Sequence, residues 1–491
     1  MLNAIRKSIW LASVVAITAG GFSQAAFAEK PNVLMIVVDD MNDWVGCLGG
    51  HPDVKTPNID RLAKRGMLFA NAHCAAPVCN ASRVATLTGR RPGSTGIYDN
   101  SVRWHEAIPN ITSIPQHFKA SGYHVAGGGK VYHHMPGFNR KDDWHSFREQ
   151  QFDGHYQNRL HRGLDVRRFQ FPDGFPLNEL PSVKALRKPP KNPREFDWGP
   201  LEKDDDETGD GRMVSWAENL LRNAPAEPFF LAAGIYRPHL PFYAPKKYFD
   251  LYQRESIRLP HLNPNDLDDL PATGLKFASQ RREDYELVTK TGKYRELVHA
   301  YLASISFADA MVGRLLDTVD ESGQADNTII VLWSDHGWHL GEKQHLHKFT
   351  LWERATHIPL IVVAPGVTSP GAVCQQPVDM LALFPTLNDL CQLPEIDRLD
   401  GHSLAPLLKN PTPTGKRPAI TSHGQNNHAV RSKRWRYIRY ADGGEELYDH
   451  SNDPNEWTNL ATRPEFASIR TEHAKWLPTA DATPKKISRQ R

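Results

Sequence analysis

The chain has 491 residues, of which 40% are hydrophobic and 23% are charged, and this composition is typical of a globular protein. Its length predicts one large domain and a smaller one, because single hydrophobic cores stop growing at about 250 to 300 residues. The 59 basic residues nearly balance the 56 acidic residues, so the net charge gives no indication of nucleic acid as a partner.

The first 28 residues have the pattern of an export signal. Arg6 and Lys7 precede an apolar stretch, Ile9 to Phe22, and the segment ends in Ala26-Phe27-Ala28, so we expect cleavage before Glu29. An uncleaved membrane anchor is the alternative, but the apolar stretch is shorter than the ~20 residues that a span needs. Cleavage leaves 57 basic and 56 acidic residues and predicts a periplasmic or secreted protein without a stable membrane anchor.

The predicted elements of the first half alternate between strands and helices. A continuous apolar run, Asn32 to Val38, is typical of a strand buried on both faces, and it ends in Asp39 and Asp40. We expect Thr56 to cap a helix that begins at Pro57 and stops at Gly66. Three further elements are a helix at Ser113–Ala120 closed by Gly122, a strand at Tyr123–Ala126 and a buried strand at Pro228–Ile235.

The clearest helix of the chain runs from Tyr294 to Val319, where apolar residues recur at steps of three and four. It leads into a β-rich run, Asn327 to Trp333, which places Asp335 and His336 just beyond its C-terminal end. The later elements are a strand at Pro359–Ala364 and a helix at Met380–Leu390.

This alternation predicts an α/β sandwich with a mainly parallel sheet, and sites on such sheets lie beyond the carboxyl ends of the strands. Both acidic pairs fall there. The Pro- and charge-rich region from about 139 to 227 predicts long loops, which either shape a substrate mouth or form plain solvated surface.

From about residue 400 the pattern changes to that of an antiparallel hairpin, with strands at Arg434–Tyr440 and Glu446–Asp449 around a Gly443-Gly444 turn. We therefore expect a signal peptide at 1–28, a catalytic domain at 29–400 and a C-terminal subdomain at 401–491.

The most informative stretch is CNASR at Cys79–Arg83, which continues into LTGR at Leu87–Arg90. Cys79 lies where a helix begins, and the N–H groups and dipole of a helix N-terminus favour anions. Arg83 is four residues on and shares its face, so its guanidinium is suited to hold the nucleophile's oxygens and a tetrahedral oxyanion.

These residues resemble the type I sulfatase signature, in which the Cys is oxidised after translation to Cα-formylglycine. The resemblance covers nearly the whole mature chain and is closest to the iduronate-2-sulfatase branch. Other shared stretches are Asn32–Asp40, Thr56–Asp60, Gly129–His133, Pro238–Phe242, Ser334–Trp338 and Thr356–Leu360.

The resemblance implies an alkaline-phosphatase-like sandwich, with a large mainly parallel sheet flanked by helices and a smaller C-terminal α/β subdomain with an antiparallel sheet. It also implies a sulfatase that hydrolyses sulfate esters of carbohydrates, in particular sulfated uronate-containing glycans. In the mechanism of that family, the hydrated aldehyde at position 79 attacks sulfur, the alcohol leaves, and sulfate departs as the aldehyde reforms.

The site residues carried over from the family form three groups. The metal ligands are Asp39, Asp40, Asp335, His336 and the modified Cys79, and three carboxylates favour Ca²⁺. The remaining catalytic residues are Arg83, Lys130, His133, His239 and Lys348. Lys130 bridges nucleophile and sulfate, and His133 is the candidate base. His239 and Lys348 bind sulfate and act as general acids, with His345 and His347 as possible substitutes for Lys348. Trp338 and His339, together with Arg103 and His105, are the predicted substrate contacts, although a buried structural role is an equal alternative for the tryptophans at 104 and 338.

One departure from the family pattern concerns maturation. The usual signature has Pro at its third position, where this chain has Ala81. This leaves open whether the oxygen-dependent formylglycine-generating enzyme or a radical-type maturase modifies Cys79.

The other cysteines and the alternative functions stay open at this point. Cys47, Cys74, Cys374 and Cys391 remain once Cys79 is set aside, and a Cys374–Cys391 disulfide is one possibility. The first alternative function is a formylglycine-dependent phosphonate or phosphate ester hydrolase of the same superfamily. The second is a non-catalytic binder of sulfated glycans, which should lack one or more of the catalytic residues, whereas all are present.

Overall fold

The computed structural model describes residues 30–151, 176–180, 196–412, 415 and 417–486, and the backbone of 157–161 and 164–168. The predicted signal peptide lies outside these residues. None of the helices in the described part of the chain combines the length and the apolarity that a membrane span requires.

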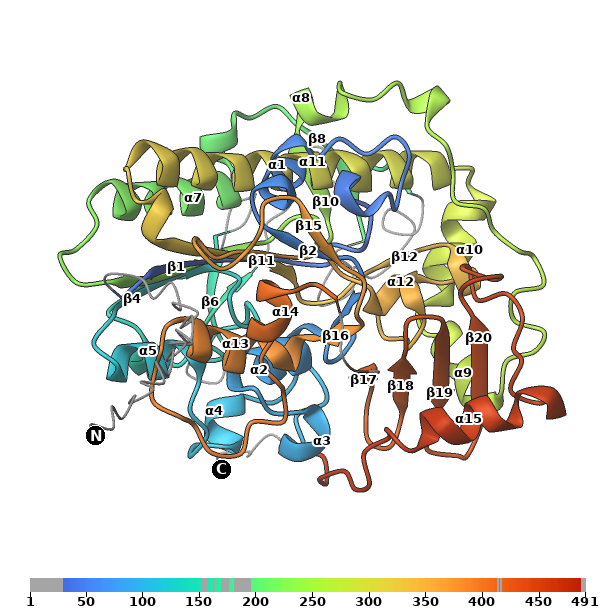
Figure 1. Ribbon diagram of the computed structural model, residues 1–491. Coiled ribbons are helices and arrows are strands. Elements are labelled where there is room, and N and C mark those ends of the chain that lie inside the picture. Colours follow the sequence, from blue (N-terminus) through green and yellow to red (C-terminus); the bar gives the residue numbers. More distant parts are fainter. Residues whose placement is uncertain are drawn as a thin grey trace, which may run out of the picture.

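An eight-stranded sheet forms the centre of the molecule (Figure 1). Its strands, in spatial order, are β15 (Ala372–Cys374), β2 (Met67–Phe69), β14 (Leu360–Val363), β11 (Thr328–Ser334), β1 (Asn32–Val38), β9 (Phe229–Ile235), β4 (His124–Gly129) and β5 (Ser146–Arg148). The five strands from β11 to β5 are parallel, and β14 is antiparallel to both of its neighbours. The mainly parallel sheet is therefore confirmed.

Two hydrophobic cores cover the two faces of the sheet. Along β1, Leu34, Ile36 and Val38 belong to one core, and the alternate residues from Val33 to Val37 belong to the other. This period of two places every side chain of the strand in a core, which is why its sequence is continuously apolar.

Helices cover both faces of the sheet and produce the sandwich (Figure 1). The helices α1 (Pro57–Arg65), α7 (Gly209–Arg222) and α11 (Tyr294–Glu321) contribute to the first core, and α2 (Cys79–Thr88), α5 (Ile114–Ala120) and α13 (Leu383–Leu390) to the second. The shorter elements are α3 (Pro92–Thr95), α4 (Trp104–Ala107), α8 (Lys246–Phe249), α9 (Ala272–Ala278), α10 (Arg282–Lys290), α12 (Glu353–Thr356), α14 (Ala405–Lys409), β3 (Ala72–His73), β6 (Gln157–His161), β7 (Leu164–Arg168), β8 (Trp198–Leu201), β10 (Phe242–Pro245), β12 (His339–Leu340), β13 (Leu346–His347) and β16 (Val378–Asp379).

The prediction of loops throughout 139–227 is wrong for residues 209–222, which form α7. The Thr208 hydroxyl accepts a hydrogen bond from the Gly211 N–H at 2.9 Å and caps the helix, and an apolar face that includes Met213 and Leu221 packs toward α11. The acidic run before it forms a short 3₁₀ turn at Asp205–Glu207 with its own capping box. Two glycines and an aspartate at the helix start, Gly209 to Gly211, concealed the short apolar face in the sequence.

The predicted role of Thr56 is also wrong, although α1 has the expected bounds. The Thr56 hydroxyl accepts from the Gly46 N–H at 2.8 Å and does not cap α1. The Asp309 carboxylate of α11 takes this role, because it accepts hydrogen bonds from the N–H groups of Asn58 and Ile59 at 3.1 and 2.7 Å. A side chain that is distant in the sequence thus accepts hydrogen bonds from the free N–H groups at the start of α1, and local sequence patterns do not reveal such a partner.

The buried Asp309 carboxyl gives a pH-dependent stability that can be measured. Burial raises its pKa from 3.8 to about 6, against the lowering effect of its hydrogen bonds. The folded state therefore binds more protons than the unfolded state between these two values, and this group's contribution to stability falls as pH rises from about 4 to about 6. In urea unfolding at pH 4 and pH 7, we expect the unfolding free energy of the wild type to fall by about 2 kcal/mol relative to that of Asp309→Asn. A difference that does not change with pH would contradict this account.

The C-terminal part forms the predicted antiparallel sheet. Its four strands are β17 (Ala419–Ser422), β18 (His428–Arg431), β19 (Trp435–Arg439) and β20 (Glu445–Asp449), and α15 (Ala467–Ala474) lies beside them. The fully buried Arg436 of β19 forms ion pairs with Glu353 and Glu456. The predicted hairpin is confirmed, while the domain bounds at 28 and 400 stay a prediction.

Candidate active site

The acidic residues of the site lie at the carboxyl ends of two neighbouring strands. In the parallel register of β1 and β11, Val38 lies opposite Ser334, so Asp39 and Asp40 come beside Asp335. The Asp40 N–H donates to Asp335 Oδ1 at 3.1 Å, and Asp40 has a φ of 60°, which turns its side chain out of the strand direction. The sheet therefore brings together carboxylates that are almost 300 residues apart.

Cys79 is the first residue of α2 and is 1% exposed. Its Sγ atom lies 3.3 Å from His336 Nε2, 3.2 Å from Lys348 Nζ and 3.8 Å from Lys130 Nζ. Burial alone would raise the pKa of the thiol, but Lys130, Lys348 and His336 together hold this pKa well below its usual range. The position is built to stabilise an anionic nucleophile.

Arg83 lies one turn from Cys79 on α2 but contacts the carboxylates. Its Nη2 donates to Asp39 Oδ1 at 3.0 Å and its Nε to Asp335 Oδ2 at 2.9 Å, while Nη1 donates to backbone carbonyls at 130 and 131. We expected this guanidinium to hold the nucleophile's oxygens, and the structure uses it to fix two carboxylates. Fully buried charges need such partners.

A metal ion fits the cluster of oxygen and nitrogen atoms around Cys79. Single ligand atoms of Asp39, Cys79, Asp335 and His336 lie within 4.8 Å of one another, and all four residues are buried. Asp40 joins the cluster, and its Oδ2 is buried without a hydrogen-bond partner. Burial raises the pKa of Asp40 to about 7, and Asp39 adds to this effect. A divalent cation would supply the missing partner, and carboxylate oxygens favour a hard one.

Lys130 reaches the site because two glycines permit a close backbone approach. It follows β4, where Gly129 has a φ of 71°, and its N–H donates to the Gly234 carbonyl at 3.0 Å. A Cβ atom on Gly234 would lie 2.3 Å from the Lys130 carbonyl carbon. The Lys130 ammonium forms an ion pair with Asp39, which lowers the pKa of that carboxyl far below its usual range against the effect of burial.

Lys348 enters from a loop with unusual backbone geometry. His347 and Phe349 on either side have φ values of 85° and 74°, which non-glycine residues rarely adopt. Lys348 Nζ donates to Asp40 Oδ1 at 2.6 Å. Burial lowers the pKa of Lys348, but Asp40 and Cys79 raise it well above its ordinary value, so the ammonium stays protonated.

His133 and His239 face the same space as Cys79. Burial lowers the pKa of both rings, for His239 to about 3, so both are neutral near pH 7. His239 Nδ1 lies 2.5 Å from the Leu240 carbonyl, which only accepts hydrogen bonds, so the ring proton is on Nδ1. His239 Nε2 therefore carries no proton in this state.

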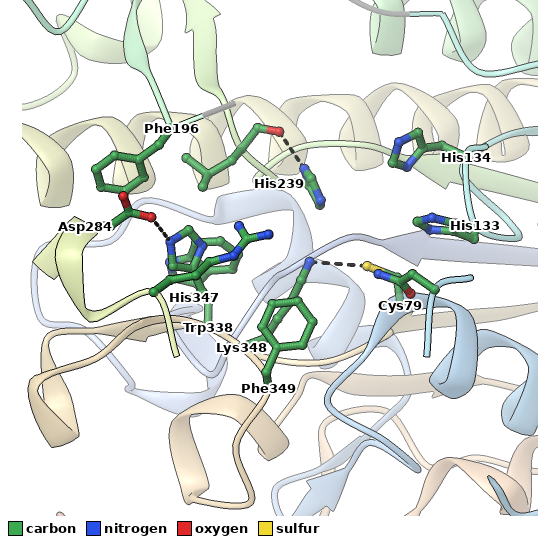
Figure 2. Close-up of a pocket in the computed structure, with 13 residues that line it drawn as sticks. Cys79, His133, His134, Phe196, His239, Asp284, Trp338, His347, Lys348 and Phe349 are labelled. Atoms are coloured by element: carbon green, nitrogen blue, oxygen red, sulfur yellow. Dashed lines mark hydrogen bonds and ion pairs between the residues drawn. The ribbon is translucent and has the colours of Figure 1, made fainter. Parts of the chain in front are cut away.

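A cavity of about 450 Å³ opens above Cys79. Figure 2 shows Cys79 and His133 on one side of it and Phe196, Asp284 and His347 on the other, with His239 and Lys348 between them. The lining consists of Cys79, Asn100, His133, His134, Phe196, His239, Leu240, Arg281, Asp284, Trp338, His347, Lys348 and Phe349. Its volume is in the range of small-molecule sites.

Among the predicted substrate contacts, only Trp338 lines this cavity. His339 follows it in the chain and points elsewhere, where its Nε2 bonds the Thr350 hydroxyl at 2.7 Å. Arg103 pairs with Glu106 at 3.1 Å, and His105 Nε2 bonds the Gly137 carbonyl at 2.9 Å, outside the lining. Adjacent residues of an extended segment point to opposite sides, which explains why Trp338 and His339 separate.

Several cavity residues gave no signal in the sequence. Phe196, Arg281, Asp284 and Phe349 belong to no motif, and only the fold brings them to Cys79. His347 was noted beside Lys348, and its Nε2 bonds Asp284 Oδ2 at 2.8 Å. The five cysteines are all free, so the possible Cys374–Cys391 disulfide is absent.

Comparison with known proteins identifies the family. The profile of the sulfatase family matches residues 31–393, and that of the N-sulphoglucosamine sulphohydrolase C-terminal region matches residues 341–482. A sulfatase from Formosa agariphila is 39% identical over 462 residues, covering 93% of this chain and 88% of that protein. Human iduronate 2-sulfatase is 34% identical over 431 residues, covering 79% of this chain and 74% of that protein.

A solved structure confirms the fold class. The phosphonate monoester hydrolase of Agrobacterium radiobacter superimposes with a TM-score of 0.72 at 20% identity, covering 91% of this chain and 94% of that one. The alkaline-phosphatase-like sandwich and the resemblance to iduronate 2-sulfatase are thus both confirmed. Because the family profile matches residues 31–393 and two named sulfatases are similar over most of their length, the chain belongs to the sulfatase family and is a sulfuric ester hydrolase.

Proposed function

We propose that this protein hydrolyses sulfate esters of carbohydrates, specifically of sulfated uronate-containing glycans, with Cys79 converted to formylglycine and Ca²⁺ as the bound metal. The observation that carries the proposal is the position of the Cys79 side chain, at a helix start with two lysines and a histidine around its sulfur atom. The similarity to an enzyme named iduronate 2-sulfatase supports a uronate as part of the substrate.

Asp39, Asp40, Asp335 and His336 would hold the calcium ion beside residue 79. When bound, the ion would polarise a sulfate oxygen and lower the pKa of the nucleophile, and the formylglycine hydrate would supply that nucleophile as a hydroxyl group. The unpartnered Asp40 Oδ2 supports the fit of the ion.

The side chains around residue 79 hold charge and move protons. The ammonium groups of Lys130 and Lys348 flank its Cβ substituent and stabilise negative charge on the nucleophile and on sulfate oxygens. His133 is neutral and lies at the same cavity wall, so it can accept a proton from residue 79. Arg83 keeps Asp39 and Asp335 oriented and does not face the cavity.

Lys348 is the better candidate for the general acid. It is protonated and within 3.2 Å of Cys79 Sγ, whereas the ring proton of His239 is donated to the Leu240 carbonyl. We therefore assign proton donation to the leaving oxygen to Lys348. His239 keeps a role in substrate binding, in which its unprotonated Nε2 accepts a hydrogen bond from a hydroxyl group. His345 bonds backbone carbonyls at 278 and 348 and does not line the cavity.

Lys348→Ala should discriminate between leaving groups. A sugar alkoxide needs a proton as it leaves and nitrophenolate does not, so we expect a loss of about 10²- to 10⁴-fold on a sugar sulfate. The loss on nitrophenyl sulfate should be at least about 10-fold smaller. His239→Ala, a residue assigned to binding, should reduce both substrates alike. Equal losses for Lys348→Ala on both substrates would argue against its role as the acid.

A panel of nitrophenyl sulfate, phosphate and phosphonate esters tests the reaction class. We expect the highest kcat/KM for the sulfate ester, with loss of activity after chelation and recovery with calcium. A clear preference for the phosphorus esters would instead support a phosphonate or phosphate ester hydrolase.

Three sequence-based predictions belong to the same proposal. They are signal cleavage before Glu29, a periplasmic or secreted location, and modification of Cys79 by a formylglycine-generating or radical-type maturase. Mass spectrometry of the exported protein measures both the new N-terminus and the residue at position 79.

A further inference from the structure

The lining of the cavity contains a second positively charged group, Arg281. This residue belongs to none of the sulfatase motifs in the sequence. It lines the same cavity as Cys79 and Lys348, in a segment between α9 and α10.

The guanidinium of Arg281 is available for a ligand. Among the residues that the structure describes, it makes no hydrogen bond or ion pair. It makes a cation–π contact with the Phe349 ring, with 5.7 Å between Cζ and the ring centroid. The neighbouring Arg282 differs, because it bonds Glu286 at 3.3 Å and Gln344 at 2.6 Å. Within the described part of the chain, Arg282 therefore has polar partners and the Arg281 guanidinium has none.

The backbone at Arg281 is ordered by hydrogen bonds at the start of α10, while its side chain is exposed. It has a φ of 54°, a conformation that non-glycine residues rarely adopt. The Asp284 N–H donates to the Arg281 carbonyl at 3.0 Å, and the Arg282 N–H donates to the Ser279 carbonyl at 3.2 Å. These bonds define the position of the Arg281 backbone at the rim of the cavity.

Among the described residues that line the cavity, Asp284 is the only one with a carboxylate, and its Oδ2 bonds His347 Nε2 at 2.8 Å. The lining therefore presents mainly cationic and neutral groups to a ligand. A substrate with one sulfate would leave the Arg281 charge without a counterpart.

We propose that Arg281 binds the carboxylate of a sulfated uronate whose sulfate ester lies at residue 79. This inference rests on the proposed function and names the group by which the site selects its substrate. A guanidinium offers a planar pair of donors that matches a carboxylate.

Arg281 and Lys348 both lie close to one aromatic side chain of the cavity wall. Arg281 Cζ is 5.7 Å and Lys348 Nζ is 5.9 Å from the centroid of the Phe349 ring. Lys348 Nζ in turn lies 3.2 Å from Cys79 Sγ. The two cationic groups thus share the part of the cavity around Phe349, beside the residue proposed as the nucleophile, so a sugar that carries both a sulfate and a carboxylate offers each of them an anionic partner.

The test compares methyl 2-O-sulfo-iduronide with its carboxyl-reduced counterpart, the neutral methyl 2-O-sulfo-idoside, and with a 2,6-disulfated form of the latter. For the wild type we expect kcat/KM to be about 10- to 100-fold higher for the uronide than for the neutral sugar, mainly through KM. In Arg281→Gln this ratio should fall close to one. Arg282→Gln is the matched control and should keep the wild-type ratio.

Each result decides the proposal. An unchanged ratio in Arg281→Gln overturns it, and so does a loss confined to the disulfated sugar, which would assign Arg281 to a second sulfate. If neither the wild type nor the two arginine variants release sulfate from any of the three compounds, the proposed function fails, and calorimetry then decides the inference. In that case Cys79→Ala protein should bind the uronide at least about 10-fold more tightly than the neutral sugar, and the double variant with Arg281→Gln should not.

Discussion

Cys79→Ala is expected to abolish sulfate ester turnover, with a loss of at least about 10⁴-fold in kcat. The variant removes the side chain that Lys130, Lys348 and His336 jointly contact, and Ala offers no group that could attack sulfur from this position. Ala is a good helix former at the first turn of α2, and the removed sulfur atom is small. We therefore expect a folded protein by circular dichroism and retained glycan binding by calorimetry, with no released sulfate.

A second cysteine provides the control for this experiment. Cys47 is half-buried and free, lies outside the cavity, and its replacement by Ala should leave turnover unchanged. Peptide mass spectrometry of active wild-type protein should find residue 79 as the aldehyde. Turnover by Cys79→Ala, or an intact thiol in fully active protein, would contradict nucleophilic catalysis by formylglycine.

Asp335→Asn is expected to have the second largest effect, because Asp335 has two partners at once. One of its oxygens lies in the proposed calcium cluster, and Oδ2 accepts from Arg83 Nε at 2.9 Å. The neutral amide removes one anionic ligand and leaves part of a buried guanidinium charge uncompensated. We expect calcium affinity to fall by at least about 10-fold and stability to fall by about 3 kcal/mol or more.

Calcium calorimetry and urea unfolding measure these two effects separately. Asp309→Asn is the matched control, since it also neutralises a buried aspartate but lies at the start of α1, away from Cys79. That variant should bind calcium like the wild type. If Asp335→Asn kept the wild-type calcium affinity, its assignment as a ligand would be wrong, whatever its stability.

Part of the active site could be predicted because its residues sit in short local patterns. Apolar strands that end in acids predicted the positions of Asp39, Asp40 and Asp335, since parallel strands have their carboxyl ends at one edge of a sheet. The start of α2 was equally visible around Cys79. For these residues, distance along the chain does not matter, because the sheet register fixes where they meet.

Other features escaped prediction because they depend on partners far away in the sequence. The capping of α1 by Asp309 and the carboxylate contacts of Arg83 are examples. In each case the side chain could bond several kinds of partner, and the tertiary packing around the buried charge determines which partner it has. The helix α7 was missed for a related reason, since its short apolar face has meaning only against α11.

The sequence by itself determined the alternation of strands and helices, the helix start at Cys79, and the group of acidic residues at the strand ends, because periodicity and local motifs encode these directly. Only the tertiary structure decided which side chains share the cavity. It separated His339 from Trp338 and brought Arg281 and Asp284 into the cavity that Cys79 also lines. The physical reason is that a cavity is bounded by segments distant in the chain, and their side-chain directions follow from packing and backbone torsions that no local pattern specifies.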